Sequence, residues 1–529
     1  MTTISGDLGR IKLGVVPVPE GATWTSATYT PSGRVLVAYR RGDDPVDMMR
    51  LVTCDDDGSD VTGVFAGPIP QHPKANGIRF MVFGDNRRVH LGDWVLEATP
   101  DLDSCESVEL VPVEYPWGLK DNPYVTHHWS EVIVAPDNES VAWTILRSDM
   151  GAGAAVAQLT RVGDVYVHHN PQLISSADAV LEDPERPGLL LPQPLLGGEV
   201  KQFVHGGTAI SLVGGSDGFL PDSCVQDLTA PRVEPITRTP GYDETTILSP
   251  DERLGIVMTS SASPRTDPAV LGLLPRPHAP LVGMSLAWAV YTYAVTGVRQ
   301  FREGNVGPVL IDVARSTSEP GYRGVPLHDP DQNWVYVSPM SWHPDGSRVM
   351  WMEMRRGNGD DLRVRVARLL DAVPGEPVPT RQTPRHIPYA LVGDRALEVL
   401  NRPPAGPTLG RIAGRVSGHA DYELQPGDLT QGRPGSASIR YVGYSDDGAT
   451  TYDGTESALS SFVDQTVYEA DLEAVGARPG SMHLRAVWSP MVGPEPARLV
   501  FNTADDPTSG SHGVARYGEA ELTVDQLAP

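Results

Sequence analysis

The chain has 529 residues and a formal net charge of -25, and 40% of its residues are apolar and 21% charged. This length exceeds what one compact core usually holds, so we expect several domains or a repeat architecture. The composition excludes long disordered stretches, and the excess of acidic residues argues against nucleic acid or anionic lipid as partners.

The cellular setting is indicated by the cysteines and by the first residues. Cys54, Cys105 and Cys224 are too few and too scattered for a disulfide framework or a Cys-based zinc site. The opening MTTISGDLGRIKLG lacks an apolar segment of signal-peptide length. Residues 277–298 carry no formal charge, but their β-branched and aromatic content favours strands buried between sheets over a membrane span. We therefore predict a cytoplasmic protein without a membrane partner.

One pattern returns along the chain: an apolar run, a short turn that usually contains Pro and Asp or Gly, and a second run rich in Val, Ile, Thr, Tyr and Trp. Pro presets φ, and Asp or Gly tolerates the tight corner, so each copy predicts a β-hairpin. In chain order the strong and weak copies begin at residues 24, 76, 127, 197, 242, 336 and 386.

The spacing of these hairpins predicts the architecture. Each hairpin is followed by a less regular segment that could supply two more strands. A single four-stranded sheet leaves both of its faces open, whereas stacking such sheets radially buries them against one another. The predicted fold class is therefore all-β, a β-propeller with seven blades preferred in a range of six to eight. A set of separate β-sandwiches is the structural alternative.

The turns themselves resemble a known repeat. "SPDE…GIVM" (249–258) and "HPDGSRVMWM" (343–352) resemble the WD40-like (PD40), TolB-type β-propeller repeat, and the resemblance covers roughly residues 15–400. It implies the fold but leaves function open, because that repeat serves binding proteins, peptidase gating domains and lyases. A more distant similarity to oligogalacturonate lyases, propellers with a His-rich metal site in the channel, rests only on the repeat and the available histidines.

The C-terminal part has a different sequence pattern from that of the repeats. We assign residues 1–400 to the propeller and residues 401–529 to an additional β-rich, β-sandwich-like module, because short alternating runs follow the Pro-rich stretch 401–410. The alternative is that part of this module, such as the final GEAELTVDQL, closes the last blade.

Candidate site residues follow from propeller geometry. The innermost strand of each blade lines the central channel, so residues about five to nine positions before each turn are expected to meet at the channel mouth. The candidate catalytic residues are His127, His128, Glu131, Tyr242, Asp243, Glu244 and His386. The candidate substrate-binding residues are Trp24, His72, Lys74, Asn76, Tyr336, Ser338 and Arg385.

These residue types suit metal binding and acid–base chemistry. Imidazole and carboxylate groups bind divalent Mn, Zn or Fe, and clustered ionisable groups shift each other's pKa. We expect His128 and His386 to be metal ligands, and Tyr242 and Arg385 to orient substrate. Neighbours in a strand point to opposite faces, so His127 and His128 reach one metal together only from a loop. The alternative is that these residues are solvated rim positions without a role.

The sequence thus predicts a cytoplasmic β-propeller that binds a small or carbohydrate-like ligand at the channel mouth. We expect an enzyme, a hydrolase or a carbon–oxygen lyase, that uses a divalent metal or, as the alternative, no cofactor. The alternatives are a non-catalytic platform for protein–protein interaction and a structural subunit of a larger complex. The sequence leaves the oligomeric state open.

Overall fold

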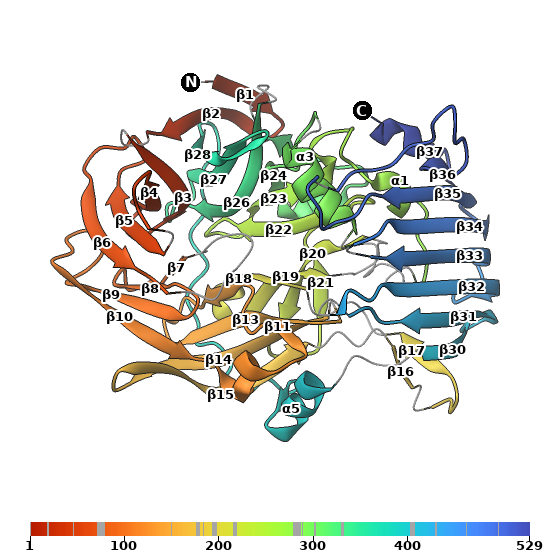
Figure 1. Ribbon diagram of the computed structural model, residues 1–529, viewed down its shortest axis with the longest axis horizontal. Helices are drawn as coiled ribbons and strands as arrows, with labels where there is room; N and C mark the ends of the chain where they lie inside the picture. Colours follow the sequence, from red (N-terminus) through yellow and green to blue (C-terminus); the bar gives the residue numbers. More distant parts are fainter. Residues whose placement is uncertain are drawn as a thin grey trace.

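The computed structural model consists mainly of antiparallel β-sheets (Figure 1). The residues it describes are 2–17, 21–45, 47–70, 80–149, 151–175, 180–182, 185–192, 198–214, 220–278, 287, 289–300, 303–328, 333–402, 408–428, 431–461, 463–495 and 497–528. Among the helices in these ranges, none combines the length and the apolar character required to cross a bilayer.

The first three β-sheet units, here called blades 1 to 3, come from the N-terminal half. Blade 1 consists of β3 (Ala22–Tyr29), β4 (Val35–Arg41), β5 (Met48–Cys54) and β6 (Thr62–Pro68). Blade 2 consists of β7 (Met81–Val82), β8 (Arg88–His90), β9 (Trp94–Thr99) and β10 (Ser107–Glu114). Blade 3 consists of β11 (Val125–His127), β12 (Val132–Val134), β13 (Ser140–Arg147), β14 (Ala152–Val162) and β15 (Val165–Ser175). In blade 3 the innermost position is occupied by two short segments, β11 and β12, which both pair with β13. A short parallel contact between β10 and β15 joins blades 2 and 3 into one sheet.

Blades 4 to 6 follow the same order of strands. Blade 4 consists of β18 (Val200–Val204), β19 (Ala209–Gly214), β20 (Asp222–Asp227) and β21 (Val233–Pro235). Blade 5 consists of β22 (Asp243–Leu248), β23 (Leu254–Thr259), β24 (Val309–Asp312) and β25 (Val325–Pro326). Blade 6 consists of β26 (Trp334–Trp342), β27 (Arg348–Arg355), β28 (Asn358–Leu369) and β2 (Gly9–Val16), with β1 (Thr2–Gly6) at its edge.

The six blades form a closed ring. Neighbouring blades contact one another through the innermost strands β7, β12, β18, β22, β26 and β3, and blades 1 and 2 share a buried apolar cluster. Figure 1 shows the blades set around a common centre, as in a β-propeller. The fourth strand of blade 6 is β2, which pairs antiparallel with β28 from Ile11–Leu369 to Val16–Val364. The ring is therefore closed by a strand from the N-terminal part of the chain.

The preferred count of seven blades is not confirmed, because the described residues form six. The copy expected at His386 is not a hairpin: it forms the short strand β29 (Leu391–Val392), which pairs with β15, and the helix α5 (Asp394–Asn401). Ala396 and Leu400 lie four positions apart and are both buried against blade 3, which is the spacing of a helix rather than of a strand.

The repeated Asp of the turns has a local structural role. Asp137 Oδ1 accepts hydrogen bonds from the backbone N–H of Glu139 and of Ser140, each at 2.9 Å. Asp345 Oδ1 accepts one from Ser347 at 2.8 Å in the turn of blade 6. The carboxylate thus accepts hydrogen bonds from backbone N–H groups of the turn that do not pair with a neighbouring strand.

Residues 371–390, here called the strap, run along these turns from blade 6 back to blade 3. The second carboxyl oxygen of two turn residues binds the strap: Asp251 Oδ2 accepts from Gly375 N at 2.7 Å, and Asp137 Oδ2 accepts from Thr383 N at 3.0 Å. Between these points Arg381 N donates to the carbonyl oxygen of Gly206 at 2.8 Å. The strap therefore marks the turn side of the ring.

The segment 260–308 interrupts blade 5 between β23 and β24, and its described residues, here called the helical insertion, form short helices and loops. The insertion contains η3 (Ser260–Ala262), α1 (Ala269–Gly272), η4 (Tyr293–Gly297) and α3 (Val298–Gln300). The expectation of buried strands in residues 277–298 is wrong for the described part, because 289–300 is helical. Val290, Tyr293 and Ala294 are fully buried at a spacing of three and four residues, which is that of one helix face.

The remaining short elements connect strands or blades, or contact the C-terminal sheet. They are η1 (Pro116–Asp121), β16 (Val180–Glu182), β17 (Leu190–Pro192), η2 (His205–Gly207), α4 (Val313–Ser318) and η6 (Val524–Leu527).

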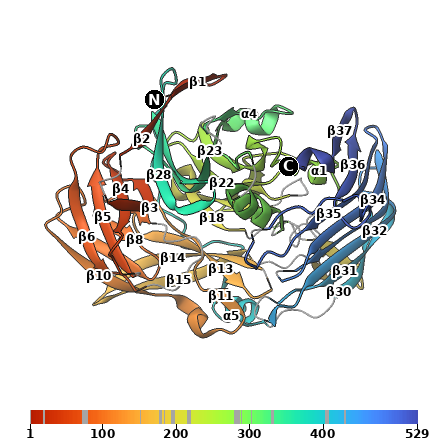
Figure 2. The same cartoon turned by 45° about the horizontal axis from the view of Figure 1, so that its top comes forward.

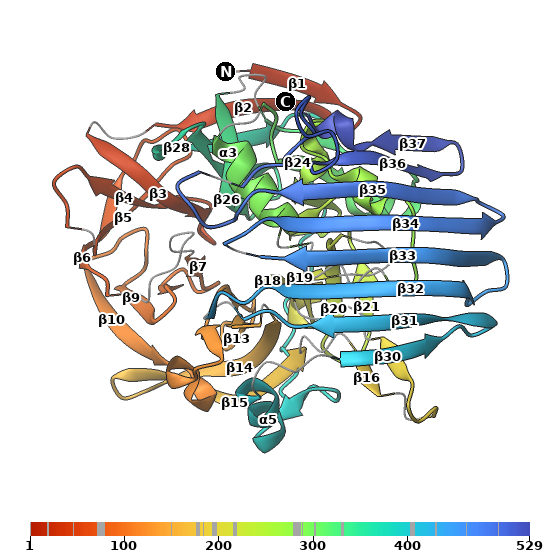
Figure 3. The same ribbon diagram turned by 45° about the vertical axis from the view of Figure 1, so that its right-hand side comes forward.

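The C-terminal part forms one eight-stranded antiparallel meander (Figure 3). Its strands are β30 (Thr408–Ala413), β31 (Ser417–Gln425), β32 (Gly435–Ser445), β33 (Thr450–Ser460), β34 (Thr466–Gly476), β35 (Gly480–Trp488), β36 (His512–Tyr517) and β37 (Ala520–Thr523). β17 contacts β30 of this sheet, and η6 contacts β36. Figure 2 shows this sheet standing beside the ring. Its inner face, including Tyr468 and Leu472, shares a core with the helical insertion, whereas Glu469 and Asp471 between them are exposed.

Two expectations for this part are therefore corrected. The described residues 408–523 form a single sheet, not a sandwich, because the helical insertion covers the apolar face that a second sheet would have covered. The final GEAELTVDQL pairs with β36 through β37 and does not close the last blade, because β2 occupies that place.

Candidate functional site

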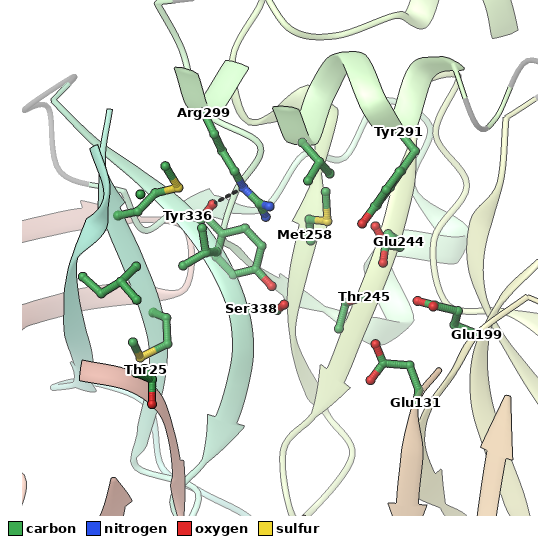
Figure 4. Close-up of a pocket in the computed structure, with 16 residues that line it drawn as sticks. Thr25, Glu131, Glu199, Glu244, Thr245, Met258, Tyr291, Arg299, Tyr336 and Ser338 are labelled. Carbon is green, nitrogen blue, oxygen red and sulfur yellow. Dashed lines mark hydrogen bonds between the residues drawn. The ribbon is translucent and has the colours of Figure 1, made fainter. Parts of the chain in front are cut away.

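A cavity of about 230 Å³ lies where the first residues of the innermost strands meet (Figure 4). Five of the six blades and the helical insertion contribute to its lining. The lining residues are Thr25, Glu131, Glu199, Glu244, Thr245, Met258, Tyr291, Val295, Arg299, Tyr336, Val337, Ser338, Met352, Met354, Gly359 and Leu362. We call this cavity the central pocket.

β-Bulges place several of these side chains. The pairing of β3 with β4 shifts register between Trp24 and Ser26, and Thr25 lies at the shift. The pairing of β22 with β23 shifts between Asp243 and Thr246, so that Glu244 and Thr245 lie there.

Two more innermost strands shift register in the same part of the strand. The shift in β18, between Val200 and Gln202, contains Lys201, and the shift in β26, between Val337 and Met340, contains Ser338. A bulge bends a strand and re-aims a side chain, and bulges are frequent next to active sites. Four blades therefore break their regular pairing where their chains reach the centre of the ring.

A buried lysine connects two carboxylates of the pocket. Lys201 Nζ lies 2.8 Å from Glu199 Oε2 and 3.1 Å from Glu244 Oε1, and its side chain is 1% exposed. Ser130 Oγ donates to the other oxygen of Glu199 at 2.5 Å. Burial of an ammonium group is tolerated because it is paired and hydrogen-bonded. Lys201 thus fixes Glu199 and Glu244, whereas Glu131 comes to the same side of the pocket from blade 3 (Figure 4).

Tyr242 lies behind this acidic side. Its hydroxyl donates to Glu244 Oε2 at 3.4 Å, and its ring lies 6.4 Å from the ring of Tyr291. Burial, and to a smaller degree the Glu244 carboxylate, raises the pKa of Tyr242 well above its ordinary value. The phenol is therefore a hydrogen-bond donor at neutral pH and supports Glu244.

The opposite side of the pocket carries a guanidinium group and a second phenol. Arg299 of the helical insertion donates from Nε to the carbonyl oxygen of Tyr336 at 2.9 Å, and its guanidinium carbon lies 5.9 Å from the centre of the Tyr336 ring. Tyr336 N in turn donates to Asn305 Oδ1 at 3.0 Å. The helical insertion therefore forms one wall of the pocket.

Four predicted site residues meet in the central pocket, as expected from ring geometry. They are Glu131, Glu244, Tyr336 and Ser338. Their roles in binding or catalysis stay predictions.

Other predicted residues of the same segments point elsewhere. Trp24 is 1% exposed and packs in the core between blades 1 and 6, because the bulge at Thr25 turns the neighbouring side chain to the pocket instead. Asp243 is 1% exposed and lines a separate small cavity with Thr239 and Thr259. Thr239 Oγ1 donates to Asp243 Oδ2 at 3.3 Å.

The two neighbouring histidines do not line the pocket either. His128 Nε2 lies 2.9 Å from Asp93 Oδ1, and its ring stands edge-on to Tyr115 at 5.1 Å, so it links blades 2 and 3. His127 is the last residue of β11, and its Nδ1 lies 3.3 Å from Thr126 Oγ1. These contacts assign both side chains to the neighbourhood of blade 3.

Arg385 and His386 belong to the strap and not to the channel mouth. The Arg385 guanidinium lies 3.5 Å from Glu139 in the turn after β12, whereas His128 precedes β12. His386 is exposed beside Arg385. His128 and His386 therefore lie at opposite ends of an innermost strand and are not brought together, because the segment at His386 forms no hairpin.

The metal prediction has no supporting ligand set in the described ranges, where no group of three His, Cys, Asp or Glu side chains is placed to hold a metal ion. His72, Lys74 and Asn76 lie outside the described residues. Binding of a divalent metal stays a prediction.

Sequence reasoning missed several residues that line the pocket or hold its lining side chains in place. Glu199 and Lys201 follow the start of the weak copy at Gly197, where the turn carries no Pro-Asp signal. Tyr291 and Arg299 come from the helical insertion, which is outside the repeat. A search for polar residues at the start of every strand that precedes a turn would have found Glu199 but not the residues of the insertion.

No protein-family model and no curated protein matches the chain. Among solved structures it is similar to TolB proteins from Agrobacterium tumefaciens and Acinetobacter baumannii. The first is 10% identical with a TM-score of 0.31, and the aligned part covers 67% of this chain and 83% of the Agrobacterium protein. The second is 11% identical with a TM-score of 0.28, and the aligned part covers 65% of this chain and 63% of the Acinetobacter protein.

The chain is also similar to part of prolyl oligopeptidase B from Galerina marginata, with 7% identity, a TM-score of 0.29, and coverage of 80% of this chain and 47% of that one. The acylaminoacyl peptidase of Pyrococcus horikoshii is 8% identical with a TM-score of 0.30, and the aligned part covers 79% of this chain and 57% of the peptidase. The chain thus spans about half the length of these peptidases. Similarity at this level does not extend to function, and the resemblance to oligogalacturonate lyases stays a prediction.

Proposed function

We propose that the central pocket binds a small, hydroxyl-rich ligand of the saccharide type and that the chain acts on it as a hydrolase or lyase. The observation that supports this most is the set of bulges in β3, β22 and β26, which replace regular pairing by side chains that line one cavity, together with the bulge in β18, which places Lys201 between two of its carboxylates. A ring built only for stability gains nothing from four such interruptions at its centre.

The lining offers the groups that a hydroxylated ligand needs. Glutamate oxygens accept hydrogen bonds from ligand hydroxyls, and the hydroxyls of Thr25, Thr245 and Ser338 both donate and accept. Two carboxylates beside a glycosidic bond can divide the roles of general acid and general base. We assign the acid–base role to Glu131 and the second carboxylate to Glu199, which Lys201 and Ser130 hold in place.

The test is a screen of mono- and oligosaccharides with the full chain. A thermal shift reports binding, new reducing ends report hydrolysis, and the ultraviolet absorbance of an unsaturated product reports elimination. On a substrate found in this way, Glu131→Gln is expected to lower turnover by about 10²–10⁴-fold, the usual contribution of a general acid or base.

Glu139→Gln is the matched control, because Glu139 is a half-exposed glutamate of the same blade in a turn on the strap side. Turnover that survives Glu131→Gln and Glu199→Gln unchanged would contradict the proposal. The alternative prediction is a non-catalytic interaction platform. It gains support if a partner protein binds the wild type and Glu131→Gln equally while no saccharide binds.

A further inference from the structure

We propose that the small cavity beside Asp243 binds one monovalent cation of about the size of sodium. The inference does not depend on the proposed function. The cavity has a volume of about 20 Å³, which is enough for a single water molecule or small ion, since such an occupant needs roughly 10–15 Å³. Its polar lining includes the Asp243 carboxylate and the hydroxyls of Thr237, Thr239, Thr259 and Ser261. We call it the Asp243 cavity.

One oxygen of the Asp243 carboxylate has no hydrogen-bond donor. Asp243 is 1% exposed, and its Oδ2 accepts from Thr239 Oγ1 at 3.3 Å. Its Oδ1 is buried, and among the described residues no donor reaches it at the distance and angle of a hydrogen bond. A buried carboxylate oxygen without a partner is costly, so this oxygen indicates a ligand in the cavity that the carboxylate lines.

Most hydroxyl protons of the lining are committed to other acceptors. Thr237 Oγ1 donates to Asp222 Oδ1 at 3.1 Å. Thr259 Oγ1 and Ser261 Oγ lie 2.7 Å apart, so one of these hydroxyls donates to the other. The lining therefore offers mainly oxygen lone pairs to an occupant, beside the free Oδ1 of Asp243. Oxygen ligands of this kind suit a hard cation.

The ligand set suits a singly charged ion. Asp243 supplies the only carboxylate of the described lining, and no group of three His, Cys, Asp or Glu side chains in the described ranges is placed to hold a metal ion. Arg238 and Arg323 also border the cavity, but both are exposed, and the Arg323 guanidinium lies 3.8 Å from Asp267 Oδ2. A divalent ion, which usually takes several charged oxygens, finds fewer ligands here than it needs.

Protons compete with the cation for Asp243. Burial raises the pKa of Asp243 to about 6, against the effect of the Thr237 and Thr259 hydroxyls and with a further increase from Asp267. The carboxyl is therefore mostly protonated at pH 5 and ionised at pH 8. Ionisation of this buried group costs stability, and a cation bound at Oδ1 offsets that cost. The other ionisable groups around the cavity are Asp222, Arg238, Tyr322 and Arg323.

The place of the cavity in blade 5 gives the cation a structural effect. Asp243 and Glu244 are neighbours at the register shift of β22. Glu244 lines the central pocket, whereas Asp243 lines the Asp243 cavity. A cation at Asp243 therefore holds the bulge that presents Glu244.

The experiment measures thermal unfolding of the full chain at pH 8 in sodium, potassium, calcium and choline chloride at equal ionic strength. We expect sodium to raise the unfolding midpoint by about 1–3 °C over choline and to saturate as for one site, because a ligand that binds only the folded chain stabilises it. Asp243→Asn should abolish the sodium effect, and the exposed Asp164→Asn should keep it. At pH 5 the sodium effect on the wild type should be much smaller.

The outcomes decide between an ion and a water molecule. Equal midpoints in all four salts overturn the inference and assign the cavity to water. A sodium effect of the same size in Asp243→Asn overturns the placement of the ion, and a larger effect of calcium than of sodium overturns its charge. Broadening of the sodium NMR signal by the wild-type chain, weaker in excess potassium, measures binding directly and decides the question even if Asp243→Asn fails to fold. None of these outcomes bears on saccharide binding in the central pocket.

Discussion

Arg276 of the helical insertion and Glu456 of β33 form an ion pair whose side chains are both fully buried, with 3.0 Å between Nε and Oε2. Tyr468 donates to the same carboxylate at 3.0 Å, and the remaining guanidinium nitrogens bind carbonyl oxygens of the insertion, among them Leu271 at 3.1 Å. The insertion that forms one wall of the central pocket is therefore attached by a charged group to the C-terminal sheet.

Replacing Glu456 by Gln leaves the Arg276 guanidinium buried without its counter-charge. We expect the free energy of unfolding to fall by about 3–5 kcal/mol, the usual effect of breaking a buried pair. The double variant Arg276→Met, Glu456→Gln should recover part of the loss, because the uncompensated charge is gone. Urea unfolding of the three proteins measures both effects.

The control is the exposed pair of Glu469 and Arg485 on the outer face of the same sheet. Glu469→Gln should change the free energy of unfolding by less than about 1 kcal/mol. Similar losses for Glu456→Gln and Glu469→Gln would show that burial of the first pair has no special effect.

Lys201→Met is expected to lower the free energy of unfolding by at least about 2 kcal/mol, because Glu199 and Glu244 then face each other without the cation between them. It should also weaken any ligand of the central pocket, since both carboxylates lose their anchor. Lys120→Met, which changes an exposed lysine of η1, is the control. Equal thermal stability of the two variants would contradict the assigned role of Lys201.

The pair Asp243 and Asp267 gives a prediction for pH. Burial raises the pKa of Asp243 to about 6, with a further increase from Asp267, and burial raises the pKa of Asp267 to about 6 against the effect of Arg323. Because these values exceed the ordinary value of 3.8, the protonated carboxyls stabilise the fold fully below about pH 4. That contribution is lost as the pH rises through 6.

Asp243→Asn removes one of the two groups. Between pH 4 and pH 8 the variant should therefore gain stability relative to the wild type, by on the order of 2–3 kcal/mol for a shift of this size. Urea midpoints at pH 4, 6 and 8 measure the difference, and the exposed Asp164→Asn serves as reference. A constant difference over this range would mean that Asp243 titrates normally in the folded chain.

The strap is held by the carboxylates of two turns, so Asp137→Ala and Asp251→Ala should release it locally. We expect trypsin to cleave after the exposed Arg381 or Arg385 about tenfold faster in Asp137→Ala, since one charge-assisted bond is lost. Asp345→Ala, whose carboxylate binds within its own turn and to His343, is the control. Cleavage equally fast in the control would assign the effect to the turn itself.

The sequence predicted the hairpins because Pro and Asp act locally. Asp137 and Asp345 hold their turns through bonds to residues two or three positions away, so the signal is readable from a few letters. The same local signal explains why four residues of the central pocket were among the predicted site residues. Glu131, Glu244, Tyr336 and Ser338 were found because they stand at a fixed distance before a turn.

The β-bulges and the helical insertion could not be predicted from such local sequence signals. Trp24 and Thr25 are neighbours, and only a shifted register in the pairing with β4 decides which of them faces the pocket. The β-branched residues Val290 and Val298 indicated a strand, yet they lie on a buried helix face because the C-terminal sheet packs over it. Long-range packing overrode local preference in both places.

Ring closure by β2 has a consequence for synthesis. Ile11 leaves the ribosome early, but its partner Leu369 is made only after five blades have been completed. Until then β2 can pair only with β1, and its apolar residues Ile11 and Leu13 lack the core that later buries them completely. A chain that ends before blade 6 is thus an open row of five blades with an apolar strand, β2, that is exposed to non-native pairing, and the ring can close only after β26 to β28 have been made.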